Sequence, residues 1–320
     1  MVYEPLKLLP CCKEYIWGGT QLKKMFAIEN APEVVAESWV LADHEDGHSA
    51  IASEPFMGKT MTDLGTVDRK AFWGMKCAEH FPLMVKLIDA AKNLSIQVHP
   101  SDRTAKPANG EQGKAEMWYI VDCKPQSYIY LGFSHATNRD EVEKRAKDGT
   151  ICEMLNKVNV KKGDIFYIPP GTVHGICEGI MIAEIQQSSN TTFRVYDYER
   201  RGADGKLRPL HLKRALDVMN YKPTIPQKCR GNGSVVFPAF SLVEMFACDD
   251  FQAYRLDIHT KIDLCCNGNS FNHLLCIDGS GEIKSARGQY PISMGDSYFI
   301  PAAAGEYSIE GECRILLSKI

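Results

Sequence analysis

Asn93-Leu-Ser-Ile-Gln-Val-His-Pro100 alternates apolar and polar side chains along its length. A period of two is typical of a half-buried β-strand, so Gln97 and His99 should project from the same face. Both side chains are of metal-ligand type, and Pro100 should end the strand because proline cannot donate to the ladder. The stretch therefore suggests half of a metal site. The alternative is an incidental histidine on a polar strand face.

Length and composition are those of a globular protein. The 320 residues are 44% hydrophobic and 24% charged, enough for one large core or two ordinary ones. The net charge of −3 argues against nucleic acid or an anionic membrane as a partner, but it allows a local basic pocket. No apolar run approaches about 18 residues, and the N-terminus lacks the basic and apolar regions of a signal peptide. We therefore expect a cytoplasmic protein without a membrane span.

The twelve cysteines form no recognisable disulfide or zinc-finger pattern. Cys11-Cys12 and Cys265-Cys266 are adjacent pairs, the others are isolated, and no Cys-x-x-Cys occurs. In a reducing compartment we expect most of these thiols to be buried as small apolar groups.

The patterns along the chain predict a mainly β protein with a few short helices. Strands are expected over Phe81–Ile88, Lys114–Val121, Asp164–Ile168 and Ile180–Gln186. Helices are expected within 66–80, after the capping residues Asn138 and Thr150, and from His211 to Asn220. The prolines and glycines of 223–234 indicate a linker, which predicts domains over residues 1–225 and 226–320.

One motif occurs twice in the chain. Gly163-Asp-Ile-Phe-Tyr-Ile-Pro-Pro170 returns as Gly295-Asp-Ser-Tyr-Phe-Ile-Pro-Ala302, and each copy follows a strand pattern that ends in aspartate. Two copies of a strand-rich unit predict a duplicated β-barrel or sandwich.

The two copies differ at the positions where ligands would lie. His174 of the first copy aligns with Glu306 of the second, and Glu116 aligns with Asn272. The second copy is therefore expected to be a degenerate structural partner without a site. The ligand-type residues expected on strands of the first copy are Gln97, His99, Glu116 and His174.

The spacing Gly-Asp-x6-Gly-x2-His over residues 163–174 matches the cupin fold, whose strands hold a metal at the mouth of a barrel. We therefore expect a double cupin, with two β-barrel or jelly-roll domains and a few short helices. Two imidazoles, a carboxylate and an amide oxygen suit one Zn²⁺ per chain with water in an open position. The same set would also accept Mn²⁺, Fe²⁺ or Ni²⁺.

Several segments carry a closer resemblance. They are Ile16–Gly19, Ala36–Trp39, Asn93–Asp102, Gly113–Trp118, Ile168–His174 and Gln187–Asp197. Together they resemble the motifs of type I mannose-6-phosphate isomerases (phosphomannose isomerases) in their short bacterial form, over about residues 14–215. The resemblance implies a zinc enzyme that interconverts mannose 6-phosphate and fructose 6-phosphate. It implies Arg194 as the catalytic arginine and, as zinc ligands, Gln97, His99, Glu116 and His174.

The chemistry of aldose–ketose isomerisation suits these residues. A proton moves between C1 and C2 through a cis-enediol, so the charge on O1 and O2 needs a Lewis acid and a cation such as Arg194. Without the resemblance, Arg194 could instead form a surface salt bridge with Asp197 or Glu199. Lys114 shares the face of its neighbouring ligand and could contact phosphate, shuttle a proton or be solvated.

The general base has two candidates. Glu184 occupies the place of an acidic residue in the longer relatives, and its pKa would be held down beside a metal and an arginine. A metal-bound hydroxide is the other candidate. Arg208 and His211 are candidate phosphate contacts.

The residues leave rival functions open. One is another cupin sugar-phosphate isomerase, acting on glucose 6-phosphate. Another is a metal-bearing cupin that binds a sugar or regulates transcription without turnover, which needs neither Arg194 nor Glu184. A third is an iron-dependent cupin oxygenase. We expect a small sugar phosphate as the partner, a monomer or weak homodimer, and neither nucleic acid nor membrane.

Overall fold

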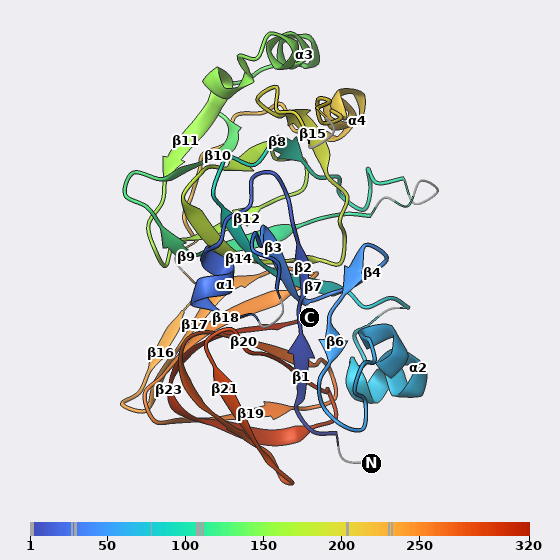
Figure 1. The fold of residues 1–320 in the computed structure, drawn as a ribbon, viewed down its shortest axis with the longest axis vertical. Coiled ribbons are helices and arrows are strands. Elements are labelled where there is room, and N and C mark those ends of the chain that lie inside the picture. Colours follow the sequence, from blue (N-terminus) through green and yellow to red (C-terminus); the bar gives the residue numbers. More distant parts are fainter. Residues whose placement is uncertain are drawn as a thin grey trace.

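The computed structural model describes residues 3–26, 28, 31–77, 79–106, 110, 112–202, 205–229, 231 and 233–320. Two groups of strands are stacked along the long axis of the molecule, and two short helices lie at one end (Figure 1). The mainly β prediction is confirmed.

Two sheets make up the unit that contains the predicted site. In spatial order, the six-stranded sheet contains β12 (Ile165–Ile168), β9 (Glu116–Cys123), β14 (Ile180–Gln187), β7 (Leu83–Ala90), β3 (Glu37–Leu41) and β2 (Cys11–Lys13). The five-stranded sheet contains β11 (Leu155–Asn159), β10 (Tyr128–Phe133), β13 (His174–Ile176), β8 (Ile96–Val98) and β15 (Phe193–Tyr196). One apolar cluster joins them, with Ile88 and Trp118 from the first sheet and Ile129 and Ile176 from the second.

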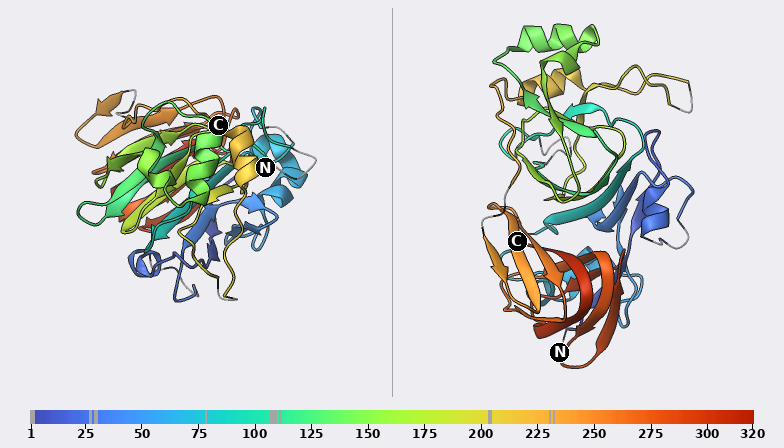
Figure 2. Two further views of the ribbon diagram at one scale, coloured as in Figure 1. Left: turned by 90° about the horizontal axis from the view of Figure 1, so that it is seen from above. Right: turned by 90° about the vertical axis from the view of Figure 1, so that its left-hand side faces the viewer.

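The other large sheet has ten strands, two of which come from the N-terminal region. Its order is β16 (Ser234–Val236), β17 (Phe240–Ala247), β18 (Gln252–Ile258), β23 (Gly305–Lys319), β20 (Asn272–Lys284), β22 (Ser297–Ile300), β1 (Leu6–Leu9) and β6 (Ala50–Ile51). In addition, β19 (Lys261–Cys266) pairs with β23, and β21 (Gln289–Ser293) pairs with β20. Among the described strands, no pairing closes a sheet on itself. Both marked chain ends lie in the lower half of the right-hand view of Figure 2.

The six-stranded sheet is a central layer that is buried on both faces. Every residue of β7 is buried. Ile88 joins the inner cluster, whereas Val85 and Leu87 join the cluster that contains Phe271 and Phe299 of the ten-stranded unit. A strand with two covered faces reads as a continuous apolar run, which explains why the sequence pattern for this segment lacks alternation.

The predicted strands are present with small shifts of their ends. The segment expected from Lys114 begins at Glu116, so Lys114 precedes β9 and does not lie on the strand. The helix expected within 66–80 is α2 (Met61–Phe72), which begins earlier because Thr60 and Asp63 form a capping box. After Thr150 there is a short 3₁₀ helix, Ile151–Met154, because β11 follows immediately.

The remaining helices and a small hairpin lie outside the sheets. They are α1 (Gln21–Met25), α3 (Arg139–Lys147), α4 (Leu212–Val218) and the hairpin of β4 (Asp43–His44) and β5 (Gly47–His48). Asn138 caps α3 by accepting from the Glu141 backbone N–H, as the sequence predicts. Within the described residues, no helix is long and apolar enough to cross a membrane.

The repeated motif forms the same strand pairing in both units. Glu116 on β9 lies opposite Ile168, and Asn272 on β20 lies opposite Ile300, so the sequence alignment of the two copies is confirmed. Asn272 Nδ2 donates to Tyr307 Oη at 2.9 Å, and both side chains are buried. The second copy therefore fills the ligand position with a neutral hydrogen-bonded pair.

His273 gives a prediction about acid stability. It is fully buried between the Ser297 and Ser318 hydroxyls, at 2.8 Å and 3.2 Å, and burial lowers its pKa to about 3. The unfolded state, with a histidine pKa near 6.5, binds more protons below that pH, so stability is lost as pH falls from about 6.5 towards 3.

At pH 5 this linkage is expected to cost the wild type about 2 kcal/mol relative to pH 7.5. A His273→Gln variant can use both hydroxyls without titrating, so its free energy of unfolding in urea should fall by about 2 kcal/mol less between the two pH values. Equal losses in both proteins would contradict this role for His273.

Candidate active site

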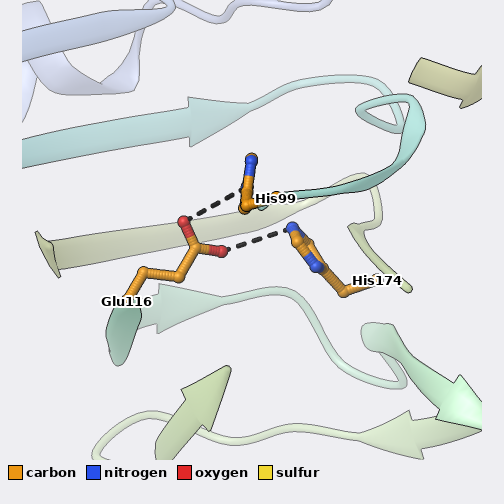
Figure 3. Close-up of side chains that lie close together, drawn as sticks. All are labelled: His99, Glu116 and His174. Atoms are coloured by element: carbon orange, nitrogen blue, oxygen red, sulfur yellow. Dashed lines mark ion pairs between the residues drawn. The ribbon is translucent and has the colours of Figure 1, made fainter. Parts of the chain in front are cut away.

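Three ligand-type side chains converge from the ends of separate strands (Figure 3). His99 follows β8, whereas Glu116 and His174 begin β9 and β13. The Nε2 atoms of His99 and His174 lie 3.5 Å and 3.3 Å from different oxygens of Glu116. One ligand atom from each residue lies within 4.8 Å of the others, and all three residues are buried. The structure thus brings together three of the four predicted ligands as one cluster.

Both imidazoles are oriented by backbone carbonyls. His99 Nδ1 donates to Thr191 O at 2.9 Å, and His174 Nδ1 donates to Thr172 O at 2.9 Å. A carbonyl can only accept, so each Nδ1 carries the proton and each Nε2 presents a lone pair to the cluster. Burial lowers the pKa of His174 to about 4 and that of His99 well below its ordinary value. The rings are therefore neutral, the state in which histidine binds a metal.

Glu116 is the carboxylate of the cluster. Its Oε1 atom is buried and has no hydrogen-bond partner among the described residues, whereas Oε2 accepts from Lys114 Nζ. Without a cation at the cluster, burial raises the pKa of Glu116 to about 8, although Lys114 lowers it. Two neutral imidazoles and a carboxylate are donor types that zinc prefers in proteins, so the donor set fits Zn²⁺.

Gln97 reaches the cluster with its nitrogen. On β8 it lies opposite His174, and its Nε2 is 3.5 Å from His174 Nε2. Its oxygen accepts from Ser95 Oγ at 3.2 Å. A ligand role requires the amide oxygen to face the cluster, which is the opposite orientation of the same amide group.

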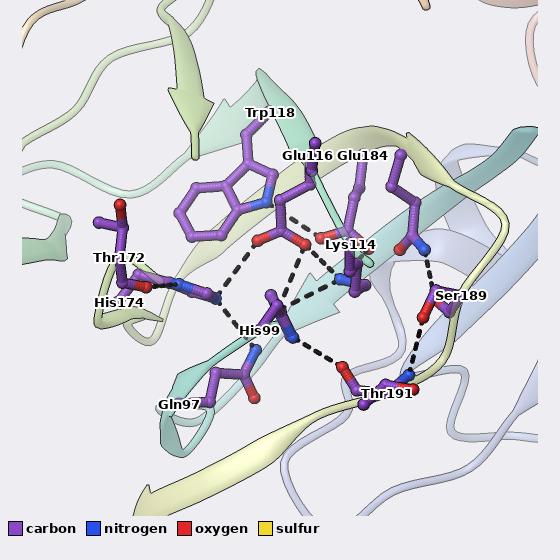
Figure 4. A network of polar contacts seen from close by, with 12 residues as sticks. Gln97, His99, Lys114, Glu116, Trp118, Thr172, His174, Glu184, Ser189 and Thr191 are labelled. Carbon is purple, nitrogen blue, oxygen red and sulfur yellow. Dashed lines mark hydrogen bonds and ion pairs between the residues drawn. The ribbon is translucent and has the colours of Figure 1, made fainter. Parts of the chain in front are cut away.

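Lys114 and Glu184 lie beside the cluster in one polar network (Figure 4). Lys114 Nζ lies 3.3 Å from His99 Nε2 and 3.8 Å from Glu184 Oε2. Burial raises the pKa of Glu184, but Lys114 and Lys86 outweigh it and hold this pKa below its ordinary value. Burial lowers the pKa of Lys114, but the charges of Glu116 and Glu184 outweigh this effect, so the pKa lies above its ordinary value. Lys114 is therefore a cation and Glu184 an anion, which are the charge states that positioning and proton transfer need.

Two residues of this network, Lys86 and Trp118, were not predicted as site residues from the sequence. Lys86, in the centre of β7, lies opposite Glu184 in the ladder, and its Nζ is 3.4 Å from Glu37 Oε2 and 3.9 Å from Glu184 Oε2. Trp118 Nε1 donates to Glu184 Oε1 at 3.0 Å. A lysine within a fully buried strand needs anionic partners, and that is the signal that could have identified Lys86.

A cavity of about 230 Å³ adjoins the cluster. Gln97, Lys114 and Glu184 line it on the side of the ligands. Among the other lining residues are basic and aromatic side chains, namely Arg194, Arg208, His211, Tyr15 and Trp17. The rings of Tyr15 and Trp17 are stacked with centroids 5.4 Å apart. The cavity therefore combines carboxylate, cationic and aromatic surfaces.

Arg194 has a free guanidinium in this cavity. It lies on β15 opposite Gln97, and within the described residues its side chain has no hydrogen bond or ion pair. Its predicted alternative partner, Asp197, is instead engaged by Arg200 and by Arg208, whose Nη1 lies 3.3 Å from both carboxylate oxygens. Burial and the charge of Arg208 lower the pKa of Arg194. An unpaired, half-buried cation of this kind favours an anionic ligand.

Comparison with known protein families gives two matches within the chain. Residues 6–128 match the model of the type I phosphomannose isomerase catalytic domain. Residues 243–320 match the model of the mannose-6-phosphate isomerase cupin domain. The matches fall in both units of the structure.

Individual relatives extend the similarity to the whole chain. Mannose-6-phosphate isomerase ManA of Bacillus subtilis is 36% identical over 100% of both chains. A crystal structure of the mannose 6-phosphate isomerase from Bacillus subtilis has a TM-score of 0.92 at 33% identity, covering 99% of each chain. A zinc-bound mannose 6-phosphate isomerase shares the fold with a TM-score of 0.77 at 16% identity, covering 98% of each chain. The chain belongs to the type I mannose-6-phosphate isomerase family.

Proposed function

We propose that the protein is a zinc-dependent isomerase that interconverts mannose 6-phosphate and fructose 6-phosphate through a cis-enediol. The observation that carries this proposal is the pair of neutral imidazoles beside the Glu116 carboxylate, with both Nε2 lone pairs aimed at one point next to a basic cavity. The names of the full-length relatives support mannose 6-phosphate as the substrate.

Zinc would be held by His99, Glu116 and His174, and by Gln97 once its amide oxygen faces the cluster. The unpartnered Glu116 oxygen and the histidine tautomers support this choice of residues. The bound ion would supply Lewis-acid polarisation of the sugar oxygens at C1 and C2. The zinc-bound relative that shares the fold supports zinc over the other divalent metals that this ligand set accepts.

Arg194 would stabilise the negative charge that develops on the same oxygens. Its guanidinium lines the cavity and has no carboxylate partner among the residues that the structure describes. A preformed donor in a site of low dielectric stabilises the transition state more than the ground state. Arg208 and His211 line the same cavity and would bind the phosphate group. Within the part of the chain that the structure describes, Arg208 contacts Asp197 through Nη1 alone, so its other donors remain for a phosphate.

Glu184 would carry the proton between C1 and C2. It is buried, ionised and fixed by the bond from Trp118, and it lines the cavity. A base at neutral pH has to be ionised, and the two lysines keep Glu184 in that state. Lys114 would hold a sugar hydroxyl or return a proton to oxygen, since its Nζ reaches the cluster and lines the cavity.

We further propose a cytoplasmic location, a monomer or weak homodimer, and domains over residues 1–225 and 226–320. All twelve cysteines are free thiols, which supports a reducing compartment. β1 and β6 complete the sheet of the second proposed domain. With this division, two short segments of the first domain therefore lie in the sheet of the second.

An assay of the purified protein tests the substrate. We expect conversion of mannose 6-phosphate to fructose 6-phosphate with a kcat/KM at least about a hundredfold above that for glucose 6-phosphate or unphosphorylated mannose. Unphosphorylated mannose lacks the anionic group for Arg208 and His211, and glucose 6-phosphate has the opposite configuration at C2, where the proton has to move. A preference for glucose 6-phosphate would support a glucose-6-phosphate isomerase instead. If none of the three sugars were converted, the proposed isomerase activity would be refuted.

A further inference from the structure

The loop between β14 and β15, residues 188–192, helps to build the proposed metal centre from outside the ligand set. Its Thr191 carbonyl accepts the bond from His99 Nδ1 at 2.9 Å, which fixes the ring and its tautomer. The next residue back, Asn190, lines the cavity. Displacement of this loop would therefore release His99 and reshape the cavity at the same time.

On its inner side the loop is held by a set of local hydrogen bonds. Gln186 Nε2 donates to Ser189 O at 2.6 Å, and Ser189 Oγ donates to Gln112 O at 3.2 Å. Thr191 N donates to Ser189 Oγ at 3.3 Å (Figure 4). These bonds fix the loop at Ser189, two residues before the carbonyl that orients His99.

The hairpin of β4 and β5 contacts the same loop at Asn190. Asn190 Nδ2 donates to Asp46 Oδ2 at 2.7 Å, across 144 positions of sequence. The tip of the hairpin is itself braced, because Asp46 N donates to His44 Nδ1 at 3.1 Å and Lys13 Nζ donates to Asp46 O. Lys13 also lies over the ring of Trp39, with its Nζ 4.8 Å from the centroid.

We propose that this hairpin clamps the loop and that Asp46 is a positioning residue for the metal centre. The connection runs from the Asp46 carboxylate to the Asn190 amide, along one residue of backbone to the Thr191 carbonyl, and from there to His99. Residues that orient a metal ligand affect metal affinity because they fix the direction of its lone pair. The inference rests on the metal site proposed above.

Three variants of the hairpin tip test the proposal through zinc affinity, measured by competition with a chromophoric chelator. Asp46→Ala is expected to raise the zinc dissociation constant by about three- to tenfold, since Asp46 acts one contact further out than a direct partner of the ligand. Asp46→Asn keeps an oxygen that can accept from Asn190, so it should restore affinity to within about twofold of wild type. Glu45→Ala removes the same charge from the adjacent position, which has no contact with the loop among the described residues, and should leave the dissociation constant unchanged.

A second readout separates positioning from a general loss of stability. In native-state hydrogen exchange of the zinc-loaded protein, the amide of Thr191 should lose protection in Asp46→Ala, while amides of the central strand β7 keep theirs. Equal zinc affinity in Asp46→Ala and wild type would overturn the clamp. So would an equal loss in Glu45→Ala, because the effect would then be one of charge. A wild-type protein that binds no zinc would instead refute the metal site itself.

Discussion

Removal of the metal is expected to reduce the isomerisation rate by about a thousandfold or more, and added zinc is expected to restore it. Lewis-acid stabilisation of a developing oxyanion contributes several kcal/mol, and about 4 kcal/mol corresponds to a thousandfold in rate. The measurement compares mannose 6-phosphate turnover as purified, after chelation with the metal content verified, and after zinc is added back. An unchanged circular dichroism spectrum after chelation would show that the loss does not come from unfolding.

The two copies of the strand unit supply a matched pair of variants for this experiment. His174 and His273 are both fully buried histidines, but only His174 faces Glu116. His174→Gln should lose stoichiometric zinc and at least about a hundredfold of kcat, whereas His273→Gln should retain both. Full activity in the protein verified to be free of metal would refute the proposed chemistry. Equal zinc loss in the two variants would show that the effect is not specific to the candidate centre.

The cluster could be predicted from the sequence because its signals are local. Gln97 and His99 are identified by the alternation of a short strand that ends at a proline, and His174 by its spacing from a turn motif. The strands on which these residues lie are also readable, since each carries a hydrophobic pattern between turn residues. Glu116 and His174 begin strands of two different sheets, β9 and β13, so it is the packing of one sheet against the other that brings them to the same point, and no local pattern indicates that packing.

Other parts of the site depend on register and could not be predicted. Lys86 contacts Glu184 only because β7 pairs with β14, and it contacts Glu37 only because β3 pairs with β7. The run from Phe81 to Ile88 shows a lysine among apolar residues but says nothing about which strands flank it. The same limit applies to Asp46, whose partner Asn190 is 144 positions away. Long-range pairing is set by the whole sheet and leaves no trace in a short window of sequence.

The sequence also could not predict that strands from the two ends of the chain pair with each other. β1 and β6 pair with each other, and β1 pairs with β22, so the first strand of the chain extends the sheet formed by the last strands. The sequence of β1 reads only as a short apolar run. Its place in the sheet is set by its pairing with β22, which lies almost 300 positions later and which no local pattern encodes.

Arg194 is expected to contribute the largest effect of any side chain that does not bind the metal. Arg194→Ala should lower kcat for mannose 6-phosphate by about a hundred- to a thousandfold, the range seen when one oxyanion donor is removed. The structural reason is that the guanidinium already lies in the cavity and has no ion pair with any described residue, so it needs no rearrangement before it meets the developing charge. Zinc affinity should not change, because the Arg194 side chain makes no contact with the ligand cluster among the described residues.

Two matched changes make this prediction specific. Arg194→Lys keeps the charge but loses the planar fork, so it should recover only part of the lost rate if two oxygens are bound together. Arg139→Ala removes an arginine that pairs with Asp217 on the exposed helices α3 and α4 and should leave kcat unchanged. A raised KM with unchanged kcat in Arg194→Ala would assign this residue to substrate binding, as a phosphate contact, and not to the transition state. Wild-type kcat and KM in the same variant would refute a role for Arg194 in turnover, because no developing charge would then depend on its guanidinium.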